Sequence, residues 1–535
     1  MSSHPPPSVE RYRELRTRME TPLPPRYNIA AAICDRWAGD PARPAILVPE
    51  ADWTVRAVTF ADLRDASSRL ANAFAALGVA RGDRVGICLA QTVECAVTHV
   101  AVQRLGAIAV PVSVMAGTDA LRHRLVDSGT RLAVADASTH AWVLDDDGLT
   151  DVTWAMVGEA PTGTLAFAGL IADARSGREP VDTAIDDPAL IVYTSGTSGQ
   201  PKGALHGQRV VPAHTESISL AHDLFPVPGD ILWSPADWAW AGGLVNCLFV
   251  TLQAGFPIVA YRPRFEPETV LELLSRLRIT AAFLPPTALK LLRDHDVASR
   301  KLPLRAVMTG GERCGEDTIA WARHELGLTP NEVYGQTECS AVIGNSGTLF
   351  PVKPGSIGLE YPRVRAAVID DDGSELEAGA IGEIAFHRST ASMFLGYWDG
   401  KGPAAAESDW HRTGDLGRRD GDGYFWHEGR RDDVILSSGY RIGPGEVEEC
   451  IARHPAVRAV AVIGEADELR GQVVSAVLEL REGAPPRAQL EDELRQAVRS
   501  ELAPYEVPRR FHVVDELPRT DNGKLRRAEL RRLLR

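Results

Sequence analysis

Hydrophobic and polar positions follow a strand–helix–strand order in the first half of the chain. Asp83–Ala90 and Ile108–Ser113 are two short, mostly apolar runs, as is typical of buried strands. Thr92–Ala107, between them, has the length and composition of a helix. The rhythm returns near 132–135, 258–261 and 306–308. The pattern predicts an α/β fold, layered and with mostly parallel sheets.

The pattern changes near Gly429, where the polar, glycine-rich stretch "GRRDDVILSSGYRIGPGEVEE" begins. The residues after it predict a helix at 446–453, strands at 456–463 and 472–480, a helix at 488–502 and a strand at 510–514. About 100 residues of this kind is the size of a small α+β domain. We therefore expect an N-terminal domain at 1–431 and a C-terminal domain at 432–535.

Composition excludes several classes of protein. The chain has 535 residues, 44% of them hydrophobic, and a formal net charge of −14, so we expect a globular protein of more than one domain that does not bind nucleic acid. The first twenty residues lack the apolar core of a signal peptide, and the apolar run Cys247–Ala260 is too short to span a membrane. Seven cysteines without a CxxC pair indicate a reducing, cytoplasmic location without disulfides or structural zinc.

The stretch "IVYTSGTSGQPKG" (Ile191–Gly203) passes from a buried strand into small hydroxyls, glycines and one lysine. Glycines allow close approach of the backbone, and the exposed N–H groups of such a loop bind anions. The candidate phosphate-binding residues are Thr194, Ser195, Gly196, Thr197, Ser198, Gly199 and Lys202. This is not a Walker A loop, because Pro201 precedes the lysine. A flexible linker is the alternative, but linkers rarely follow a buried strand directly.

Three further stretches carry candidate chemistry. "NEVYGQTEC" (331–339) ends a strand with Thr337 and Glu338, a hydroxyl and a carboxylate suited to a phosphate and its Mg²⁺. "RTGDLG" (412–417) predicts a tight turn at Asp415, whose carboxylate can accept ribose hydroxyls. "LPRTDNGKLRR" (517–527) predicts a turn at Lys524. Taken singly, these residues also fit a helix entry, a turn former and a solvated charge in a basic tail.

In this order and at these separations, the stretches resemble the adenylate-forming superfamily of acyl- and aryl-CoA synthetases, peptide-synthetase adenylation domains and luciferases. The resemblance extends from about Asn28 to the C-terminus. "SPADWAWAGG" (234–243) and "FLPPTALKLL" (283–292) are most similar to the medium-chain acyl-CoA synthetase branch. The resemblance implies a large N-terminal domain of α/β subdomains with a β-barrel-like subdomain, and a small mobile C-terminal domain.

The resemblance also implies an ATP-dependent carboxylate–CoA ligase. In its first step a small-molecule carboxylate joins the α-phosphate of ATP and pyrophosphate leaves. The loop from Thr194 to Lys202 would hold the β- and γ-phosphates, Thr337 the α-phosphate, and Glu338 with Thr197 the Mg²⁺. The nucleoside would be bound by Asp415, Arg430, Gly310, Gly311, Glu312 and Gln336. Lys524 would bridge the carboxylate and the phosphate.

In the second step the thiol of CoA attacks the acyl-adenylate, and Lys524 must leave. The family rotates its small domain about a hinge, here at Asp432, and brings Gly439 and Arg441 to the path of the thiol. The acyl pocket would be lined by Gly335, Trp238 and Trp240. Glycine at 335 predicts acids that are medium-chain, branched or aromatic rather than acetate; alternatively, Gly335 only serves a turn and the tryptophans belong to the core.

Two other functions remain open from the residues. One is a stand-alone adenylation enzyme that loads a carrier protein or activates an amino acid, with Asp237 as the candidate that meets the α-amine, although "ADWAW" fits a helix N-cap better. The other is a nucleotide sensor without chemistry, disfavoured by the presence of Lys524, Glu338 and Asp432. A lysine acetyltransferase that acts on Lys524 is a further expected partner, since acylation would remove the charge.

Overall fold

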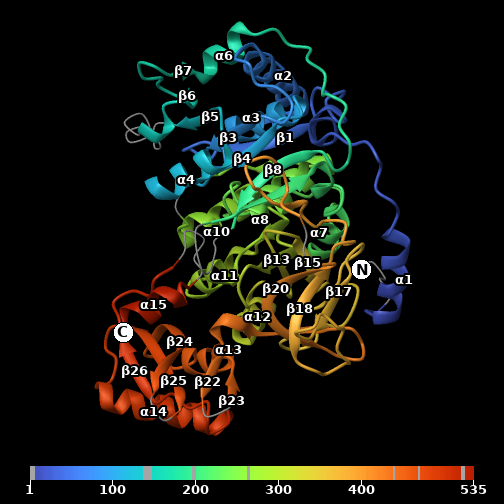
Figure 1. The fold of residues 1–535 in the computed structure, drawn as a ribbon. Helices are drawn as coiled ribbons and strands as arrows, with labels where there is room; N and C mark the ends of the chain where they lie inside the picture. Colours follow the sequence, from blue (N-terminus) through green and yellow to red (C-terminus); the bar gives the residue numbers. More distant parts are fainter. Residues whose placement is uncertain are drawn as a thin grey trace. The chain divides into compact units, whose positions relative to one another are not determined.

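The structure, a computed structural model, describes residues 6–136, 147–194, 201–261, 265–405, 408–437, 440–467, 470–519 and 525–534, with the backbone alone at 436 and 441. The chain forms two compact units (Figure 1). The first comprises Met1–Thr194, Pro201–Arg365 and Arg388–Asp409, and the second comprises Ala366–His387 and Trp410–Arg535. Each unit is described by itself below.

The first sheet of the first unit confirms the predicted strand–helix–strand order. Its strands run β19-β9-β8-β4-β3-β5-β6-β7, with parallel pairing from β8 through β7 and antiparallel pairing of β9 with β8 and β19. Their bounds are β3 Arg84–Cys88, β4 Ile108–Pro111, β5 Leu132–Asp136, β6 Thr153–Val157, β7 Leu165–Ala166, β8 Pro188–Tyr193, β9 Gly203–Gly207 and β19 Gly396–Tyr397. In Figure 1, α3 (Val93–Arg104) lies against β3 and β4, with α2 (Phe60–Ala76) next to it.

The second sheet of this unit has the order β16-β15-β14-β13-β12-β10-β11-β1-β2 and is parallel from β14 to β1. Its strands are β1 Pro44–Pro49, β2 Val55–Thr59, β10 Leu232–Trp233, β11 Ile258–Val259, β12 Ala281–Phe283, β13 Ala306–Gly310, β14 Asn331–Gln336, β15 Ser340–Gly344 and β16 Leu359–Glu360. Leu271, Leu274 and Leu289 bury the apolar faces of α10 (Pro267–Arg276) and α11 (Pro286–Arg293) in one core cluster with Trp233.

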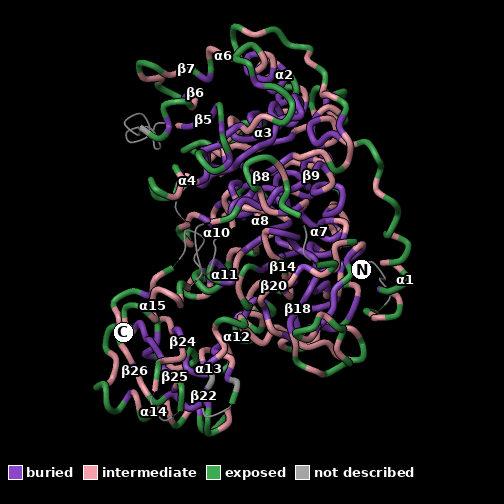
Figure 2. The backbone as a smooth tube through the Cα atoms, in the orientation of Figure 1, coloured by how far each residue is buried: buried purple, intermediate pink, exposed green. Residues whose placement is uncertain are grey.

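The remaining helices of the first unit are α1 Val9–Met19, α4 Thr118–Ser128, α6 Phe167–Asp173, α7 Thr215–Ala221, α8 Ala241–Gly243, α9 Val250–Gln253 and α12 Glu316–Glu325. Figure 2 shows the buried course of the strands in purple and the exposed loops in green, with β8 and β9 almost wholly inside. The two strands on either side of the candidate loop, β8 and β9, therefore belong to the core of the sheet.

The second unit contains two sheets. One is antiparallel, in the order β17 (Ala366–Ile369), β18 (Gly382–His387), β20 (Trp410–Arg419) and β21 (Phe425–Arg430). The other contains β22 Ile435–Ser437, β23 Tyr440–Ile442, β24 Val457–Asp467, β25 Gly471–Leu480 and β26 Arg510–Val513, with helices α13 Pro444–Ala452, α14 Arg487–Glu501 and α15 Arg527–Leu533. The predicted α+β order is confirmed, and β22, β23 and α15 are additions. The domain boundary at 431/432 stays a prediction.

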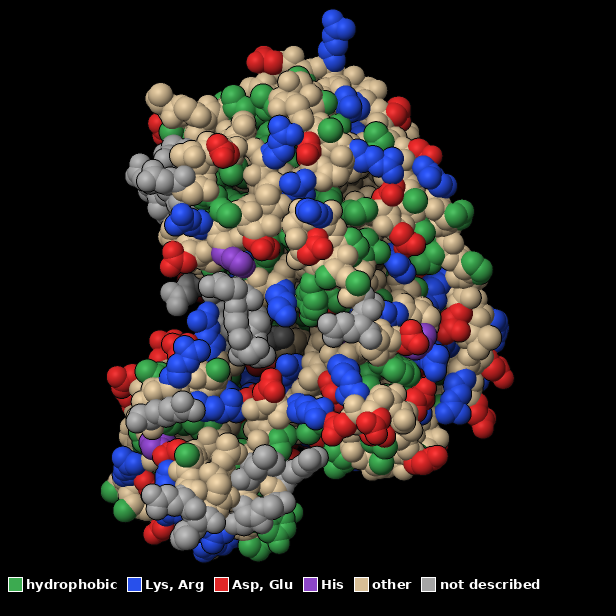
Figure 3. All heavy atoms as spheres, viewed as in Figure 1, with side chains coloured by type: hydrophobic (Ala, Val, Ile, Leu, Met, Phe, Trp, Pro, Cys, Tyr) green, Lys and Arg blue, Asp and Glu red, His purple; other side chains and the backbone are tan. Residues whose placement is uncertain are grey.

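Three whole-chain features bear on the expectations from composition. All seven cysteines are free and buried. No helix in the described ranges is long and apolar enough to cross a membrane. On the face shown in Figure 3, acidic and basic side chains are interspersed, so this face carries no basic field.

Candidate functional site

The glycine- and hydroxyl-rich loop leaves the first sheet through a narrow neck between β8 and β9. Tyr193 pairs with Gly203, and the Thr194 N–H donates to the Lys202 carbonyl over 2.9 Å. The neck is tight at Gly203, where a Cβ would lie 2.7 Å from Ile191 Cγ2. Thr194 and Lys202 therefore flank the loop. The other predicted phosphate-binding residues, Ser195, Gly196, Thr197, Ser198 and Gly199, lie outside the described residues.

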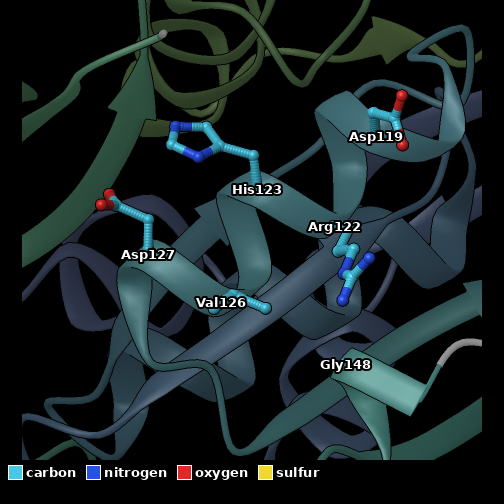
Figure 4. Close-up of a pocket in the computed structure, with 6 residues that line it drawn as sticks. All are labelled: Asp119, Arg122, His123, Val126, Asp127 and Gly148. Carbon is cyan, nitrogen blue, oxygen red and sulfur yellow. The ribbon is translucent and has the colours of Figure 1, made fainter.

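Helix α4 supports this neck from one side. His123 Nε2 lies 2.9 Å from the Pro201 carbonyl oxygen, and the Tyr193 hydroxyl donates to Asp127 Oδ2 over 2.6 Å. Figure 4 shows the Arg122 guanidinium directed toward Gly148, whereas His123 and Asp127 project from α4 away from it. A pocket beside the neck is lined by Asp119, Arg122, His123, Val126, Asp127 and Gly148. None of these residues was predicted, since nothing in their sequence pattern distinguishes them from an ordinary helix face.

Glu338 lies in the turn between β14 and β15, where Gln336 pairs with Ser340. Its side chain is only 8% exposed, and Oε1 accepts a hydrogen bond from the Tyr397 hydroxyl over 2.6 Å. The Phe394 N–H donates to the Glu338 carbonyl over 2.8 Å. Within the described part of the chain, Tyr397 is the side chain that bonds this carboxylate. The carboxylate therefore meets a neutral donor rather than a cation.

The segment 394–398 connects this turn to the loop neck. In β19, Tyr397 pairs with Ala204 of β9, and the Trp398 N–H donates to the Gly203 carbonyl over 2.7 Å. Lys202 Nζ lies 5.4 Å from the centroid of the Tyr397 ring, within range of a cation–π interaction. One tyrosine thus contacts two predicted site residues, Lys202 and Glu338. Tyr397 was not predicted as a site residue, although the aromatic run "FLGYW" around it was an available signal.

Two buried histidines lie beneath the Glu338 turn. His214 Nε2 is 3.0 Å from the Cys339 carbonyl oxygen. Burial lowers the pKa of His206 to about 3, so that its ring is neutral at pH 7. Ser340, directly after the turn, has a φ of 57° and donates to Asn246 Oδ1 over 2.7 Å. A non-glycine residue in this left-handed conformation costs energy and persists because its surroundings hold it.

Gly335 precedes the same turn, and its backbone packs closely against the opposite strand. A Cβ at this position would overlap the Ser340 carbonyl oxygen. The hairpin therefore requires glycine at 335 whatever lies beyond it, and the acyl-pocket role of Gly335 stays a prediction.

The two tryptophans assigned to the acyl pocket differ in burial. Trp238 is 1% exposed, as a core residue is. Trp240 is half-buried, and its ring centroid lies 5.9 Å from the Arg124 guanidinium carbon. Asp237 accepts from the Ala239 N–H over 3.1 Å and from the Ser113 hydroxyl over 2.6 Å. The predicted N-cap at Asp237 is wrong, because α8 begins later and Trp240 occupies the capping position.

The predicted adenine-lining segment follows β13. A Cβ at Gly310 would lie 2.6 Å from the Val333 carbonyl oxygen, while Gly311 has a φ of 92° and open space beside it. Glu312 Oε1 accepts from the Thr287 N–H over 2.9 Å, which ties its side chain to α11. The glycines therefore leave a stretch of bare backbone, and the Glu312 side chain turns to a structural partner.

In the second unit, the predicted tight turn at Asp415 is wrong. Asp415 lies inside β20 and pairs with Arg430 of β21, because β18 and β21 flank this strand on both sides. Its side chain is 7% exposed. Arg430 Nη1 lies 3.1 Å and His427 Nε2 3.5 Å from Asp415 Oδ1. The structure thus brings Asp415 and Arg430 together, as the resemblance implies.

A buried glutamate links Gly414, the residue before Asp415, to the predicted hinge. Glu383 accepts from the Gly414 N–H over 2.8 Å and from Arg412 over 2.9 Å. The same carboxylate lies 3.3 Å from Arg431, which also pairs with Asp371 at 2.7 Å. Arg431 is therefore bound to the β17–β18 part of the unit.

The next residues are bound to the C-terminal part instead. Asp433 pairs with Arg531 at 2.8 Å and with Arg527 at 3.3 Å, both on α15. Arg531 also donates to the Asp432 carbonyl over 3.2 Å, and Arg527 reaches Glu448 of α13 at 2.8 Å. Arg431 is thus paired with one part of the unit and Asp433 with the other, and the predicted hinge residue Asp432 lies between them.

The remaining predicted residues have little or no described geometry. Lys524 and Gly439 lie outside the described residues, and Arg441 is known by its backbone in β23 alone. Gln336 and Thr337 stand at the end of β14 and in the following turn. No group of three or more His, Cys, Asp or Glu side chains within the described ranges could hold a metal ion.

Comparisons with known proteins agree with the resemblance. The AMP-binding enzyme family matches residues 34–398, and the AMP-binding enzyme C-terminal domain matches residues 446–524. An uncharacterised acyl-CoA ligase of Bacillus subtilis (strain 168), YtcI, is 30% identical and covers 95% of this chain and 96% of its own. Human mitochondrial acyl-coenzyme A synthetase ACSM4 is 33% identical over 96% of this chain and 92% of its own.

A solved structure of the anthranilate CoA ligase AuaEII, in complex with anthranoyl-AMP, is also similar to this chain. It has a TM-score of 0.86 and 26% sequence identity, and the match covers 96% of this chain and 98% of that one.

Proposed function

The chain belongs to the family of AMP-binding enzymes, with the C-terminal domain of that family included, and from this premise we propose that it is an ATP-dependent carboxylate–CoA ligase. It activates a carboxylic acid as acyl-AMP, releases pyrophosphate, and then transfers the acyl group to CoA. The observation that carries the proposal is the contact of Tyr397 with both Glu338 and Lys202. A carboxylate and an ammonium are thereby gathered beside a loop of glycines and hydroxyls.

The Glu338 carboxylate fits the Mg²⁺ that the family uses. Its Oε1 is occupied by a neutral hydroxyl, so the other oxygen can face a cation, and Mg²⁺ is usually bound through one or two carboxylates together with substrate phosphates. Thr197 would complete the protein's contribution. When bound, Mg²⁺ supplies charge neutralisation at the triphosphate.

The other residues act on the anionic reactants. Lys202 and the loop N–H groups hold the β- and γ-phosphates, and Thr337 orients the α-phosphate. Asp415 accepts the ribose hydroxyls and Arg430 orients Asp415, while the bare backbone of Gly310 and Gly311 lines the adenine. Lys524 holds the carboxylate against the α-phosphate, because two anions react only when their repulsion is offset and they are positioned.

The second half-reaction requires rotation of the C-terminal part about Asp432. The ion pairs support this hinge position: Arg431 is bound to Glu383 and Asp371, whereas Asp433 is bound to Arg527 and Arg531. Torsion at Asp432 leaves both sets of contacts intact. The rotation removes Lys524 and brings Gly439 and Arg441 to the path of the CoA thiol.

The acid is proposed to be larger than acetate: medium-chain, branched or aromatic. The similarity to a ligase crystallised with anthranoyl-AMP supports an aromatic or other bulky acyl group. Gly335 adds no separate support, because its backbone contact with Ser340 already requires glycine. Each methylene buried in an apolar pocket contributes about 0.8 kcal/mol, close to fourfold in affinity.

The proposal is tested with a panel of acids: acetate, butyrate, hexanoate, isobutyrate, benzoate and phenylalanine, each with ATP, Mg²⁺ and CoA. We expect AMP and an acyl-CoA with at least one acid larger than acetate. In Lys524→Ala, acyl-adenylate formation should fall by roughly 100- to 1000-fold, whereas transfer from pre-made acyl-adenylate to CoA should persist.

Three results would contradict this proposal in different ways. Pyrophosphate release with phenylalanine and no acyl-CoA would favour the stand-alone adenylation enzyme. Preference for acetate would refute the acyl assignment, and equal losses in both half-reactions of Lys524→Ala would refute the role of Lys524. Treatment with a lysine acetyltransferase should reduce the first half-reaction alone if Lys524 is its target.

A further inference from the structure

We infer that Tyr397 is a positioning residue of the adenylation site: it fixes the Glu338 carboxylate for the cation that accompanies ATP, and it orders Lys202 at the loop neck. The inference rests on the proposed function. Tyr397 touches neither reacting group by itself. It acts through two residues that lie far from it in the chain, and the contacts on both are part of the described structure.

The position of Tyr397 is set by the backbone of β19. Tyr397 pairs with Ala204, and the next residue, Trp398, donates its N–H to Gly203 over 2.7 Å. On the other side, the Phe394 N–H donates to the Glu338 carbonyl over 2.8 Å. The ring of Phe394 packs edge-on against Tyr397 at 5.0 Å between centroids. The tyrosine is therefore held by both the loop neck and the Glu338 turn.

The hydroxyl of Tyr397 acts on Glu338 as a hydrogen-bond donor. The Tyr397 hydroxyl donates to Glu338 Oε1 over 2.6 Å, and the Tyr397 backbone is held in β19. A carboxylate with one oxygen fixed in this way has one rotamer and one oxygen left for a cation. An arginine in the same place would also fix the rotamer, but it would neutralise the charge that a cation needs.

The aromatic face of Tyr397 attracts the ammonium group of Lys202. Its Nζ lies 5.4 Å from the ring centroid, and an ammonium over an aromatic face is attracted without being neutralised. Lys202 therefore stays near the neck and keeps its charge for a phosphate. A glutamate in place of Tyr397 would repel Glu338, and it would pair with Lys202 and neutralise the charge that a phosphate needs.

The test uses Tyr397→Phe, which keeps the ring and removes the hydroxyl. The matched control is Tyr27→Phe in the same unit, because the Tyr27 hydroxyl donates to Gln253 Oε1 over a similar 2.7 Å. Binding of ATP is measured by calorimetry without carboxylate or CoA, once with Mg²⁺ and once with a chelator. Thermal unfolding of both variants without ligand shows whether each one folds.

We expect Tyr397→Phe to weaken binding of ATP with Mg²⁺ by about tenfold, which is the effect of losing one hydrogen bond to a charged group. Binding of ATP with chelator should change by less than about threefold, because the ring that faces Lys202 remains. Tyr27→Phe should match wild type in both measurements. In a Glu338→Gln background, Tyr397→Phe should have no further effect on Mg²⁺-dependent binding, since it acts through Glu338.

The opposite results are equally distinct. Unchanged or tighter binding with Mg²⁺, or equal losses with Mg²⁺ and with chelator, would overturn the inference. The same holds if Tyr27→Phe weakens binding as much, or if the losses of Tyr397→Phe and Glu338→Gln add. Failure of the wild-type protein to bind ATP at all would instead overturn the proposed function, so the two failures are separable.

Discussion

Glu338 in the first unit and Asp415 in the second are both buried carboxylates from predicted site motifs, and their partners are opposite in kind. Glu338 is bonded by the neutral Tyr397 hydroxyl at 2.6 Å. Asp415 lies 3.1 Å from the Arg430 guanidinium, with His427 at 3.5 Å. This difference in partners indicates which kind of ligand each carboxylate can bind. A carboxylate with a neutral partner attracts a cation, whereas one balanced by arginine suits neutral donors such as ribose hydroxyls.

The two residues also differ in what lies next to them. Asp415 follows Gly414, whose N–H donates to Glu383, and the Glu383 carboxylate also pairs with Arg412 and with Arg431 beside the predicted hinge. Glu338 stands in a hairpin turn tied to the loop neck by residues 394–398. We therefore expect changes at Glu338 to affect the cation, and changes around Asp415 to affect the nucleoside or the domain rotation.

The largest effect is expected for Glu338→Gln. The amide oxygen can still accept from Tyr397, but the charge for Mg²⁺ is lost, and acyl-adenylate formation should fall by roughly 100- to 1000-fold. The measurement is acyl-adenylate formation at increasing Mg²⁺. Glu360→Gln, which removes the ion pair with Arg16 in the same unit, is the matched control and should remain near wild type. Activity of Glu338→Gln within threefold of wild type would contradict the assignment of Glu338.

The second largest effect is expected at the hinge. Asp432→Pro fixes φ and removes the N–H, so it should trap one domain orientation. Adenylation should persist, whereas thioester formation from pre-made acyl-adenylate should fall by about tenfold or more. Asp432→Ala, which keeps backbone freedom and removes only the carboxylate, serves as control. Normal acyl-CoA synthesis by the proline variant would refute the hinge at Asp432.

A smaller effect is expected for Asp415→Asn. Hydrogen bonds from ribose hydroxyls to a carboxylate are charge-assisted, and their loss should weaken ATP binding by about tenfold without changing the Mg²⁺ dependence. The measurement is the ratio of the affinities for ATP and for 2′,3′-dideoxy-ATP, which lacks both ribose hydroxyls. This ratio should be smaller in Asp415→Asn than in wild type. Glu428→Gln, which disrupts the pair with Arg418 at 3.0 Å in the same sheet, is the control. Unchanged discrimination would show that Asp415 does not meet the ribose.

The sequence predicted the strands whose residues form a continuous, mostly apolar stretch. Strands β3, β4 and β13 are mostly apolar and are buried except at Arg84, because parallel strands are covered on both faces. Strands β22 and β23 escaped prediction because their pairing, Ile435 with Ile442, is embedded in a polar, glycine-rich stretch. Asp415 was misplaced in a turn because Gly and Asp favour turns locally. Its strand is set by β18 and β21, which no local pattern reveals.

The candidate site was predictable as a set of motifs but not as a set of contacts. The loop, Glu338 and the pair Asp415–Arg430 carry their chemistry in residue type and order. Tyr397 is 59 residues from Glu338, and Arg527 is 94 residues from Asp433. The basic C-terminal stretch therefore suggested a solvated tail, whereas Arg527 is an ion-pair partner of Glu448. Such partners are fixed by tertiary packing, which periodicity does not encode.

The smallest predicted effect concerns acid stability and follows from the histidines of the first unit. Burial lowers the pKa of His99 and of His206 to about 3, and that of His222 to about 4. An unfolded histidine has a pKa near 6.5, so the unfolded chain binds more protons below that pH and stability is lost as pH falls. Each buried histidine should cost about 1.4 kcal/mol between pH 7.5 and pH 5.5. His427, beside Asp415, is partly exposed.

His99→Leu isolates this effect. Neither ring nitrogen of His99 has a hydrogen-bond partner in the described structure, and its nearest aromatic contact is Phe249 at 5.5 Å between centroids. Leucine should therefore leave stability at pH 7.5 unchanged or raised, and should reduce the loss on going to pH 5.5 by about 1.4 kcal/mol. Denaturant unfolding at both pH values measures the difference. His324→Gln, a change of an exposed histidine, should leave it as in wild type. An unaltered pH difference in His99→Leu would mean that His99 titrates alike in the folded and unfolded states.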